Sequence, residues 1–522
     1  KNISMSRIII VSLFCFVGFA LLGQNITIST ERNPNEPSIM MNPKNPAQLV
    51  AACNINSYYI SQDTGRTWST HRLTSSHGVW GDPVISVDTA GHFYFFHLSN
   101  PADGNWIDRI VCQKTVDHGQ TWNDGSYTGL NGSKAQDKHW CDIDRTDNTL
   151  YLTWTQFDSY GSSDPSLKSN ILFSKSTDQG ETWSPALKIN HIDGDCIDSD
   201  NTVEGAVPAV GPEGQIYVTW AGPNGLVFNK STDKGNTWLD KEIKIDPMPT
   251  GWDYSIPGIS RANGLPVTVC DLSNGQYRGT IYVNWTDQRN GSDDTDVWLA
   301  KSTDQGATWS SPIRVNDDAA GKQQFFTWMA IDQTTGFLYF VFYDRRNHDN
   351  LATDVYMAVS KDGGQTFINR KISETPFVPN DGIFFGDYTN IVAHNGIVRP
   401  IWTRLHEGSL SVLTDVTPIE KILNTSVKES QASTETKFTN YPNPSKDVSY
   451  VSYKLKKNTV VSLAIHDING QLIKTIIDHE LRPFGSYVDE INLKQMALVT
   501  GVYLIRLNLD GKTKTERQVV IH

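Results

Sequence analysis

The segment STDQGETW, residues 176–183, decides the fold, because close variants of it recur along most of the chain. Six segments follow the pattern [S/T]-x-D-x-G-x-T-[W/F]. They are SQDTGRTW (Ser61–Trp68), TVDHGQTW (Thr115–Trp122), STDQGETW (Ser176–Trp183), STDKGNTW (Ser231–Trp238), STDQGATW (Ser302–Trp309) and SKDGGQTF (Ser360–Phe367). Self-similarity at a roughly constant period is the sequence signature of a repeat architecture.

The chemistry of this motif predicts a structural role. Its aspartate can accept hydrogen bonds from backbone N–H groups of its own turn, and its glycine supplies a positive φ two residues later. The closing Trp or Phe is expected to bury its ring against a neighbouring sheet. We therefore expect the six aspartates to stabilise hairpins and not to act in catalysis.

Strand-like alternating runs surround each motif, as in GQIYVTWAG at residues 214–222. A repeated unit of about 55 residues with four strands is a propeller blade. The motifs resemble the BNR/Asp-box repeats of sialidases and related propellers, over about residues 25–420. This resemblance implies an all-β chain with an Asp-box β-propeller.

The innermost strands give the number of blades. They are predicted to begin near Glu36, Asp82, His139, Glu204, Ile256, Phe326 and Asp387. One position of the second strand is held by Trp154, Trp220, Trp285, Phe342 and Trp402, and by His97 in the second repeat. This count favours seven blades, with six as the alternative. The seventh unit lacks an Asp-box, and Asn25–Thr30 is expected to supply its outer strand and so remove the exposed sheet edges.

Composition and the first residues indicate export. The chain has 522 residues and a net charge of −12, which argues against nucleic acid and anionic membranes as partners. Residues 1–24 are predicted to be a signal peptide, because Lys1 and Arg7 precede a short apolar run, Ile8–Leu22. The run is too short to favour a membrane span, so none is expected in the mature protein. Five cysteines follow it, enough for two disulfides at most.

A separate module is expected at the C-terminal end. Residues 421–436 are polar and predict a linker. Residues 437–522 carry YPNP (Tyr441–Pro444), DINGQLI (Asp467–Ile473) and TGVYLIRL (Thr500–Leu507). This order of motifs resembles the type A C-terminal sorting domain of type IX secretion cargo. It implies a small β-sandwich, the type IX secretion machinery as partner, and a secreted or outer-surface location. A generic fibronectin-like sandwich is the alternative.

Charged residues are predicted to gather at one mouth of the central channel, where inner strands begin and the loops after second strands emerge. The strand starts contribute Glu36, Asp82, His139, Glu204, Arg261, Asp387 and Tyr388. The loops contribute Asp287, Arg289, Asp344, Arg345, Arg346 and Arg404.

These residues suggest a site for an anionic sugar. Arg289, Arg346 and Arg404 come from three consecutive blades and can hold a carboxylate or sulfate, while Arg261 and Asp387 are further candidates for substrate binding. Sialidases use an arginine triad, a tyrosine nucleophile assisted by a glutamate, and an aspartate acid/base. The resemblance implies these catalytic roles for Tyr388, Glu204 and Asp82. The alternative is that Asp287, Asp344 and Arg346 form salt bridges that seal the ring of blades.

An acidic segment precedes Glu204. DGDCIDSD supplies Asp193, Asp195, Asp198 and Asp200, and oxygen-rich loops suit Ca²⁺. The segment is a candidate site for a structural calcium ion, and the other reading is a solvated acidic loop. No cofactor is expected to be required for catalysis.

Two classes of function remain open. The first is a secreted or cell-surface glycoside hydrolase, sialidase-like, acting on anionic glycans or glycoproteins. The second is a non-catalytic propeller that binds glycans or proteins in adhesion, because fold alone does not fix function.

Overall fold

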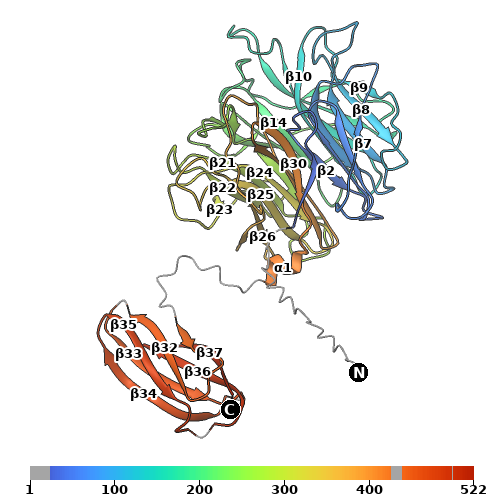
Figure 1. Cartoon of the computed structure of the whole chain (residues 1–522). Coiled ribbons are helices and arrows are strands. Elements are labelled where there is room, and N and C mark those ends of the chain that lie inside the picture. Colours follow the sequence, from blue (N-terminus) through green and yellow to red (C-terminus); the bar gives the residue numbers. More distant parts are fainter. Residues whose placement is uncertain (1–23, 425–437, 456, 469, 497, 522) are drawn as a thin grey trace, which may run out of the picture. The chain divides into compact units, whose positions relative to one another are not determined.

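The computed structural model of the chain describes residues 24–424 and 438–521, apart from 456, 469 and 497. The predicted signal peptide and most of the predicted linker lie outside the described residues. The chain divides into two compact units, one on each side of residue 425 (Figure 1).

Within residues 24–424, the strands form seven four-stranded antiparallel sheets. From the innermost strand outward, the first three blades are β2 (Ser38–Met41), β3 (Leu49–Cys53), β4 (Ser57–Ser61) and β5 (Ser69–Arg72); β6 (Gly81–Val87), β7 (Phe93–Leu98), β8 (Ile110–Thr115) and β9 (Ser126–Thr128); and β10 (Ala135–Ile143), β11 (Leu150–Phe157), β12 (Ser169–Ser176) and β13 (Leu187–Lys188). The next three are β14 (Glu204–Val210), β15 (Ile216–Gly222), β16 (Gly225–Ser231) and β17 (Ile243–Asp246); β20 (Val267–Cys270), β21 (Ile281–Asp287), β22 (Asp296–Ser302) and β23 (Ile313–Arg314); and β24 (Gln324–Asp332), β25 (Phe337–Asp344), β26 (Asp354–Ser360) and β27 (Ile368–Lys371). The seventh is β28 (Asn390–His394), β29 (Ile397–His406), β30 (Ser409–Asp415) and β1 (Asn25–Ser29).

The seven sheets close into a ring. Each innermost strand contacts the innermost strand of the next blade, and β28 of the last blade contacts β2 of the first. The outer strand of the seventh blade is β1, which pairs with β30 from Asn25 opposite Asp415 to Ser29 opposite Val412. Seven blades and closure by the N-terminal strand are therefore confirmed. The seventh blade needs no Asp-box, because its outer strand does not follow its third strand in the chain.

Each Asp-box forms the turn between the third and outer strands of its blade. In the third blade, the Asp178 Oδ1 atom accepts the Thr182 N–H at 2.9 Å and the Ser176 hydroxyl at 2.7 Å. The Ser176 Oγ atom in turn accepts the Gly180 N–H at 2.8 Å. Gly180 has a φ of 84°, in the left-handed region that glycine adopts without strain. The predicted structural role of the motif is confirmed.

The motif also holds neighbouring blades together. The ring of Trp238 packs edge-to-face on Phe173 of the preceding blade at 5.0 Å between centroids, and Trp309 packs on Phe228 at 5.2 Å. A Cβ atom at Gly235 would lie 2.4 Å from the Phe173 ring, so a larger residue would push the two blades apart. The glycine is therefore needed for close approach as well as for its φ.

A basic residue adds a hydrogen bond to most of these contacts. Lys175 donates to the Lys234 carbonyl at 2.7 Å, and Lys230 donates to the Gln305 carbonyl at 2.7 Å, in each case from the third strand to the next blade's Asp-box. At the junction of the last and first blades, Arg399 Nε donates to the Thr64 carbonyl at 2.6 Å. Ring closure thus uses a similar inter-blade hydrogen bond, made by an arginine on the second strand, β29.

Two segments differ from the sequence-based prediction. The innermost strand of the fifth blade is β20, and not the segment near Ile256. That segment instead lies in a long connection whose two short strands, β18 (Asp253–Tyr254) and β19 (Ala262–Asn263), pair with each other. The helix α1 (Ile419–Asn424) continues past residue 421, where the linker was predicted to begin, and it buries Ile419 and Ile422 in the propeller core.

The C-terminal unit consists of two sheets, with orders β31-β32-β35 and β34-β33-β36-β37. The strands are β31 (Thr439–Tyr441), β32 (Val448–Leu455), β33 (Thr459–His466), β34 (Leu472–Arg482), β35 (Gly485–Asn492), β36 (Gly501–Leu509) and β37 (Lys512–Val520). Side chains of both sheets, among them Val451 and Leu463, share one core. The YPNP motif follows β31, and its Asn443 Oδ1 accepts the Val519 N–H of β37 at 2.7 Å. The predicted small β-sandwich is confirmed.

Among the described residues, no helix is long and apolar enough to cross a membrane. The five described cysteines, Cys53, Cys112, Cys141, Cys196 and Cys270, are all free thiols.

We predict that the N-terminal strand stabilises the ring through Ile28, which is 6% exposed and packs between the last and first blades against Val412 and Ile39. Ile28→Ala should lower the free energy of unfolding by about 2–4 kcal/mol, the range for deleting a buried aliphatic side chain. Urea denaturation followed by tryptophan fluorescence measures it. Thr27→Ala on the exposed side of the same strand is the control, and equal stability of the two variants would contradict a closing role for β1.

Candidate functional site

A repeated β-bulge shapes the mouth of the channel. Near its start, the innermost strand contains an extra residue in four blades, where the register shifts between Gly81 and Val84, Asp137 and Trp140, Glu204 and Val207, and Phe325 and Trp328. The residue after the first of each pair has a positive φ: 50° at Asp82, 48° at Lys138, 76° at Gly205 and 50° at Phe326. This conformation costs a non-glycine residue about 1–3 kcal/mol, and such strain is concentrated at functional sites.

Six carboxyl groups gather at this mouth from five blades. They are Glu36 before β2, Asp82 on β6, Asp137 on β10, Asp198 and Glu204 at the fourth blade, and Asp387 before β28. Glu36, Glu204 and Asp387 are at most 3% exposed. Asn54 bridges the first two blades, because it donates to Glu36 and accepts the Asp82 N–H at 2.8 Å.

Two cations connect opposite sides of the mouth. Lys138 of the third blade donates to Asp387 Oδ2 of the seventh at 2.7 Å, and its Nζ lies 3.7 Å from Asp82 Oδ2. Arg261 Nε donates to Asp387 Oδ1 at 2.9 Å, and its NH1 lies 3.4 Å from Asp198 Oδ2. Both cations therefore contact Asp387. At longer distances, Lys138 also lies near Asp82 and Arg261 near Asp198.

Three of the acids are held in the protonated form. Burial raises the pKa of Asp137 to about 8, and the negative charge of Asp82 adds to the shift. Burial and the charge of Asp198 raise the pKa of Glu204 well above its usual range. Burial and the charge of Asp82 do the same to the pKa of Glu36.

Two others are held in the ionised form. Burial opposes ionisation of Asp387, but Lys138 and Arg261 outweigh it and lower its pKa far below the usual range. Burial also opposes ionisation of Asp82, but the charge of Lys138, helped by hydrogen bonds from Glu36 and Asp137, lowers its pKa. The pKa of Asp82 is therefore lowered, while the pKa values of its neighbours Glu36 and Asp137 are raised.

Aromatic rings close the channel below these charges. Trp140 lies 4.4 Å from Trp328 and 5.2 Å from Tyr388 between ring centroids. One pocket, lined by Lys138 and Asp387, lies on the mouth side of the rings, and a second, lined by the inner strands, lies beyond them. Trp140 and Trp328 line both pockets, so they form the floor of the mouth.

The predicted catalytic residues Asp82, Glu204 and Tyr388 do meet at this mouth, together with Arg261 and Asp387. The surroundings of Tyr388 suit packing better than nucleophilic attack: burial raises its pKa, and the negative charges of Asp82 and Glu36 raise it further. A neutral phenol is a poor nucleophile.

The structure does not bring Arg289, Arg346 and Arg404 together around an anion. Arg289 pairs with Asp287 of its own blade and with Asp246 of the preceding blade, each at 2.8 Å. Arg346 pairs in the same way with Asp344 at 2.7 Å and with Asp317. Their guanidinium groups lie over the rings of Trp298 and Tyr356, both on third strands.

These two arginines therefore seal the ring of blades, which was the alternative prediction for Arg346. Arg404 occupies the second-strand position of Asp287 and Asp344, two residues after the buried aromatic residue, and not the position of the other two arginines.

Each aspartate of the acidic segment has a partner within the protein. Asp193 pairs with Lys188, Asp195 accepts the Thr202 hydroxyl, Asp198 accepts the Tyr160 hydroxyl, and Asp200 accepts the Asp253 N–H. In the described part of the chain, no group of three or more His, Cys, Asp or Glu side chains is arranged to hold a metal ion.

Sequence analysis missed Asp137, Lys138 and Tyr160. The prediction aligned His139 with Asp82, but the bulge makes Lys138 the true equivalent. The spacing to the second strand does not reveal this, because His139, and not Lys138, lies 15 residues before Trp154, as Asp82 lies 15 residues before His97. Tyr160 lies in a loop outside the repeat, where no pattern identifies it.

Comparisons with known proteins assign the C-terminal unit. Residues 439–522 match a family model described as a secretion system C-terminal sorting domain. The protein is therefore exported to the cell surface or the extracellular space, as predicted. No curated protein matches the chain.

Solved structures resemble the chain only weakly. A polysaccharide lyase, a PL25 ulvan lyase, has a TM-score of 0.45 and 12% identity over 74% of this chain and 95% of that one. An α-L-arabinofuranosidase from Fusarium graminearum has a TM-score of 0.43 and 12% identity over 76% and 98%. A Hadza microbial sialidase has a TM-score of 0.38 and 13% identity over 70% and 72%. None of these similarities assigns an activity to this chain.

We predict a stability signature for the protonated Asp137. Its folded pKa of about 8 lies above the unfolded value of about 3.9, so the folded state binds one proton more between these limits. This group therefore lowers the free energy of unfolding as the pH rises from about 4 to 8, by at most about 1.4 kcal/mol per pH unit. In Asp137→Asn that decline should be shallower, so the variant gains stability relative to the unchanged protein as the pH rises.

Urea denaturation at pH 5, 6, 7 and 8 measures this difference. Asp193→Asn, in the loop after β13, is the matched control and should follow the unchanged protein at every pH. Parallel curves for Asp137→Asn and the unchanged protein would contradict a raised pKa at Asp137.

Proposed function

We propose that the channel mouth hydrolyses glycosidic bonds by acid–base catalysis, with Asp137 as the proton donor and Asp82 as the ionised carboxylate. The observation that carries the proposal is the position of these two groups on neighbouring inner strands, Asp82 on β6 and Asp137 on β10, with pKa values shifted in opposite directions. Carboxyl groups whose surroundings separate their pKa values in this way are the acid and base pairs of many hydrolases.

The chemistry follows from the two environments. Asp137 has a pKa near neutrality and is 8% exposed, so it can release its proton to a glycosidic oxygen that enters the mouth. As the bond from that oxygen to the anomeric carbon breaks, the Asp82 carboxylate stabilises the positive charge on the sugar ring. Water adds to the anomeric carbon, and Asp82 takes the proton that the water loses. The starting state returns when Asp82 releases this proton to solvent and Asp137 takes one from solvent.

In this proposal Lys138 does not contact the substrate, and its role is to keep Asp82 ionised. Its charge lowers the pKa of Asp82, and its salt bridge to Asp387 fixes its own position. Glu204 is a less suitable donor than Asp137 because it is only 1% exposed.

The charges of the mouth favour a neutral glycan as the substrate. Six carboxyl groups face two cations, and both cations are bound to Asp387. A sugar carboxylate or sulfate would meet this negative surface, and Arg289 and Arg346, two of the arginines predicted to hold it, are paired elsewhere. The proposal therefore departs from the anionic substrate that the sequence suggested.

A glycan-binding propeller without catalytic activity is the second candidate. The observation in its favour is the network of Lys138, Arg261 and Asp387, whose salt bridges cross the mouth and occupy part of the space a substrate would need.

The test is incubation of the purified protein with a panel of neutral, uronate-containing and sulfated glycans, with products analysed by mass spectrometry. We expect a neutral sugar released with the addition of water. Asp137→Asn and Asp82→Asn should each lower kcat about 10²- to 10⁴-fold, the usual contribution of a general acid or base. Activity should also fall as the pH rises through about 8, where Asp137 loses its proton.

Asp193→Asn is the control and should leave kcat unchanged. Glycan binding with no product from any substrate would favour the second candidate. Full activity in Asp137→Asn would overturn the assignment of the proton donor.

A further inference from the structure

Three aromatic residues form a continuous wall at the rim of the mouth. Trp80 precedes β6, Trp106 lies between β7 and β8, and Tyr160 lies between β11 and β12. The ring centroids of Trp80 and Trp106 are 6.2 Å apart, and those of Trp106 and Tyr160 are 5.7 Å apart, both edge-to-face. We call these three residues the rim wall.

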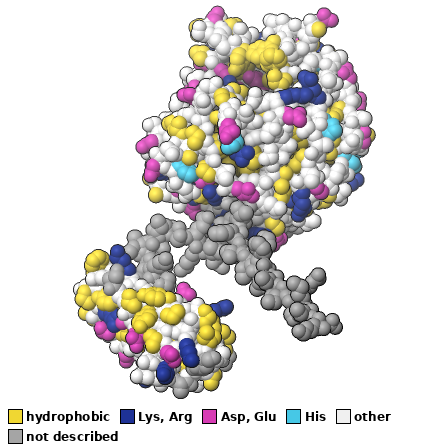
Figure 2. Space-filling model, in the orientation of Figure 1, with side chains coloured by type: hydrophobic (Ala, Val, Ile, Leu, Met, Phe, Trp, Pro, Cys, Tyr) yellow, Lys and Arg dark blue, Asp and Glu magenta, His cyan; other side chains and the backbone are white. Residues whose placement is uncertain are grey.

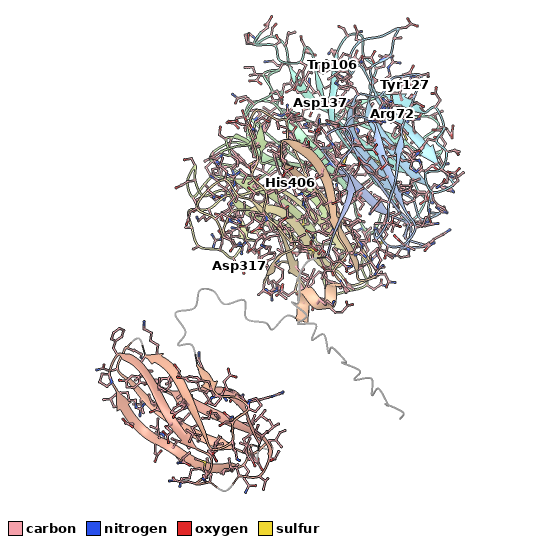
Figure 3. The ribbon with its side chains drawn as sticks, in the orientation of Figure 1. Arg72, Trp106, Tyr127, Asp137, Asp317 and His406 are labelled. Atoms are coloured by element: carbon pink, nitrogen blue, oxygen red, sulfur yellow. The ribbon has the colours of Figure 1, made fainter. Side chains whose placement is uncertain are left out.

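The rim wall is exposed where other tryptophans are not. Trp80 and Trp106 are 42% and 44% exposed, and they are the only two exposed tryptophans among the described residues. By contrast, Asp-box tryptophans such as Trp238 and Trp309 pack against aromatic rings of the preceding blade. Figure 2 shows an apolar patch with acidic side chains beside it at the end of the propeller where Figure 3 labels Trp106 and Asp137. Exposed aromatic side chains that no neighbouring blade covers are typical of a binding surface.

The loop that carries Trp106 is fastened in place. Asp108 is 1% exposed, and its carboxylate accepts the Ser99 hydroxyl at 2.9 Å and the Asn105 N–H at 3.0 Å. Arg109 Nε donates to the same carboxylate at 2.7 Å. Trp80 is also tied to the second blade, because its N–H donates to the Leu98 carbonyl at 2.9 Å. The wall is therefore preorganised, which reduces the entropy lost when a ligand binds.

The inner end of the wall meets the charged cluster. The Tyr160 hydroxyl donates to Asp198 Oδ2 at 2.6 Å, and the same oxygen lies 3.4 Å from Arg261 NH1. Burial raises the pKa of Tyr160, and the negative charges of Asp137 and Asp198 raise it further, so the phenol is neutral beside the proposed proton donor. The wall thus leads from solvent directly to the acids.

We propose that the rim wall binds successive sugar residues of a neutral oligosaccharide chain whose cleaved bond lies at Asp137. This inference rests on the proposed function for the position of the bond, but the binding itself does not. The apolar C–H faces of sugar rings pack on aromatic side chains, and their hydroxyl groups require the hydrogen-bonding partners that Asp198 and Arg261 supply beside the wall. The substrate is accordingly a chain of several residues, held across the second and third blades.

The test separates binding from hydrolysis. The purified protein carrying Asp137→Asn is titrated with neutral oligosaccharides of two and six residues from the xylose, arabinose, glucose, mannose and galactose series. Binding is followed by tryptophan fluorescence and by calorimetry. At least one six-residue series should bind, and adding Trp106→Ala should weaken that binding by 10-fold or more. Binding of the two-residue member should change by less than threefold.

Val116→Ala is the control, because Val116 is 64% exposed and lies between β8 and β9 of the same blade. Trp106→Phe keeps a ring at the site and should retain most of the affinity, which shows that the fold of the loop is intact.

Each result decides one of the two proposals. If the protein hydrolyses glycans but Trp106→Ala binds the six-residue chain as tightly as the Val116→Ala control, the rim wall proposal is overturned while the proposed function stands. If no glycan is hydrolysed but the loss of binding in Trp106→Ala is observed, the rim wall proposal holds and the catalytic one fails. Absence of binding to all five series would overturn the rim wall proposal.

Discussion

The contact between each Asp-box and the preceding blade is the constraint on which the rest of the propeller depends. The aspartate fixes the turn, the glycine lets that turn approach a ring such as Phe173, and the closing tryptophan packs edge-to-face on the same ring. A lysine or arginine of the preceding blade then hydrogen-bonds the turn. Because one short motif supplies both the hairpin and the blade-to-blade contact, its repetition along the chain is enough to build the ring.

The contacts between blades stabilise a ring whose mouth contains residues in a strained backbone conformation. The innermost strands hold Asp82, Lys138 and Phe326 in the left-handed region, where a side chain costs free energy that the blade contacts offset. The bulge adds one residue to the inner strand, so the side chains of Asp82 and Lys138 do not follow the regular alternation between the two faces of the sheet. Lys138 consequently extends over the channel to Asp387 on the opposite side of the ring, a contact that no pair of neighbouring strands could make.

The same physics explains what the sequence could predict. The Asp-boxes, the buried second-strand aromatic residues such as Trp154, and closure by Asn25–Ser29 follow from local chemistry and spacing, and all were predicted. The repeat also predicted that the charged residues gather at one mouth of the channel. The bulge could not be predicted by counting residues from strand starts, so His139 was chosen where Lys138 acts. The partners of Arg289 and Arg346 lie on other blades, and Asp246 and Asp317 carry no local signal that would connect them to these arginines.

The protonation of the mouth is a consequence of its charge balance. Six carboxyl groups cannot all ionise in a buried space that contains Lys138 and Arg261 as counter-charges, because each further negative charge would be both desolvated and repelled. Both cations contact Asp387 directly and stabilise its negative charge most. Lys138 also stabilises the negative charge of Asp82, whose Oδ2 atom lies 3.7 Å from its Nζ atom. The surroundings of Asp137, Glu204 and Glu36 then favour the neutral form and raise their pKa values. A proton donor beside a carboxylate therefore arises from having fewer cations than acids, and a free arginine triad of the kind the sequence suggested would have removed it.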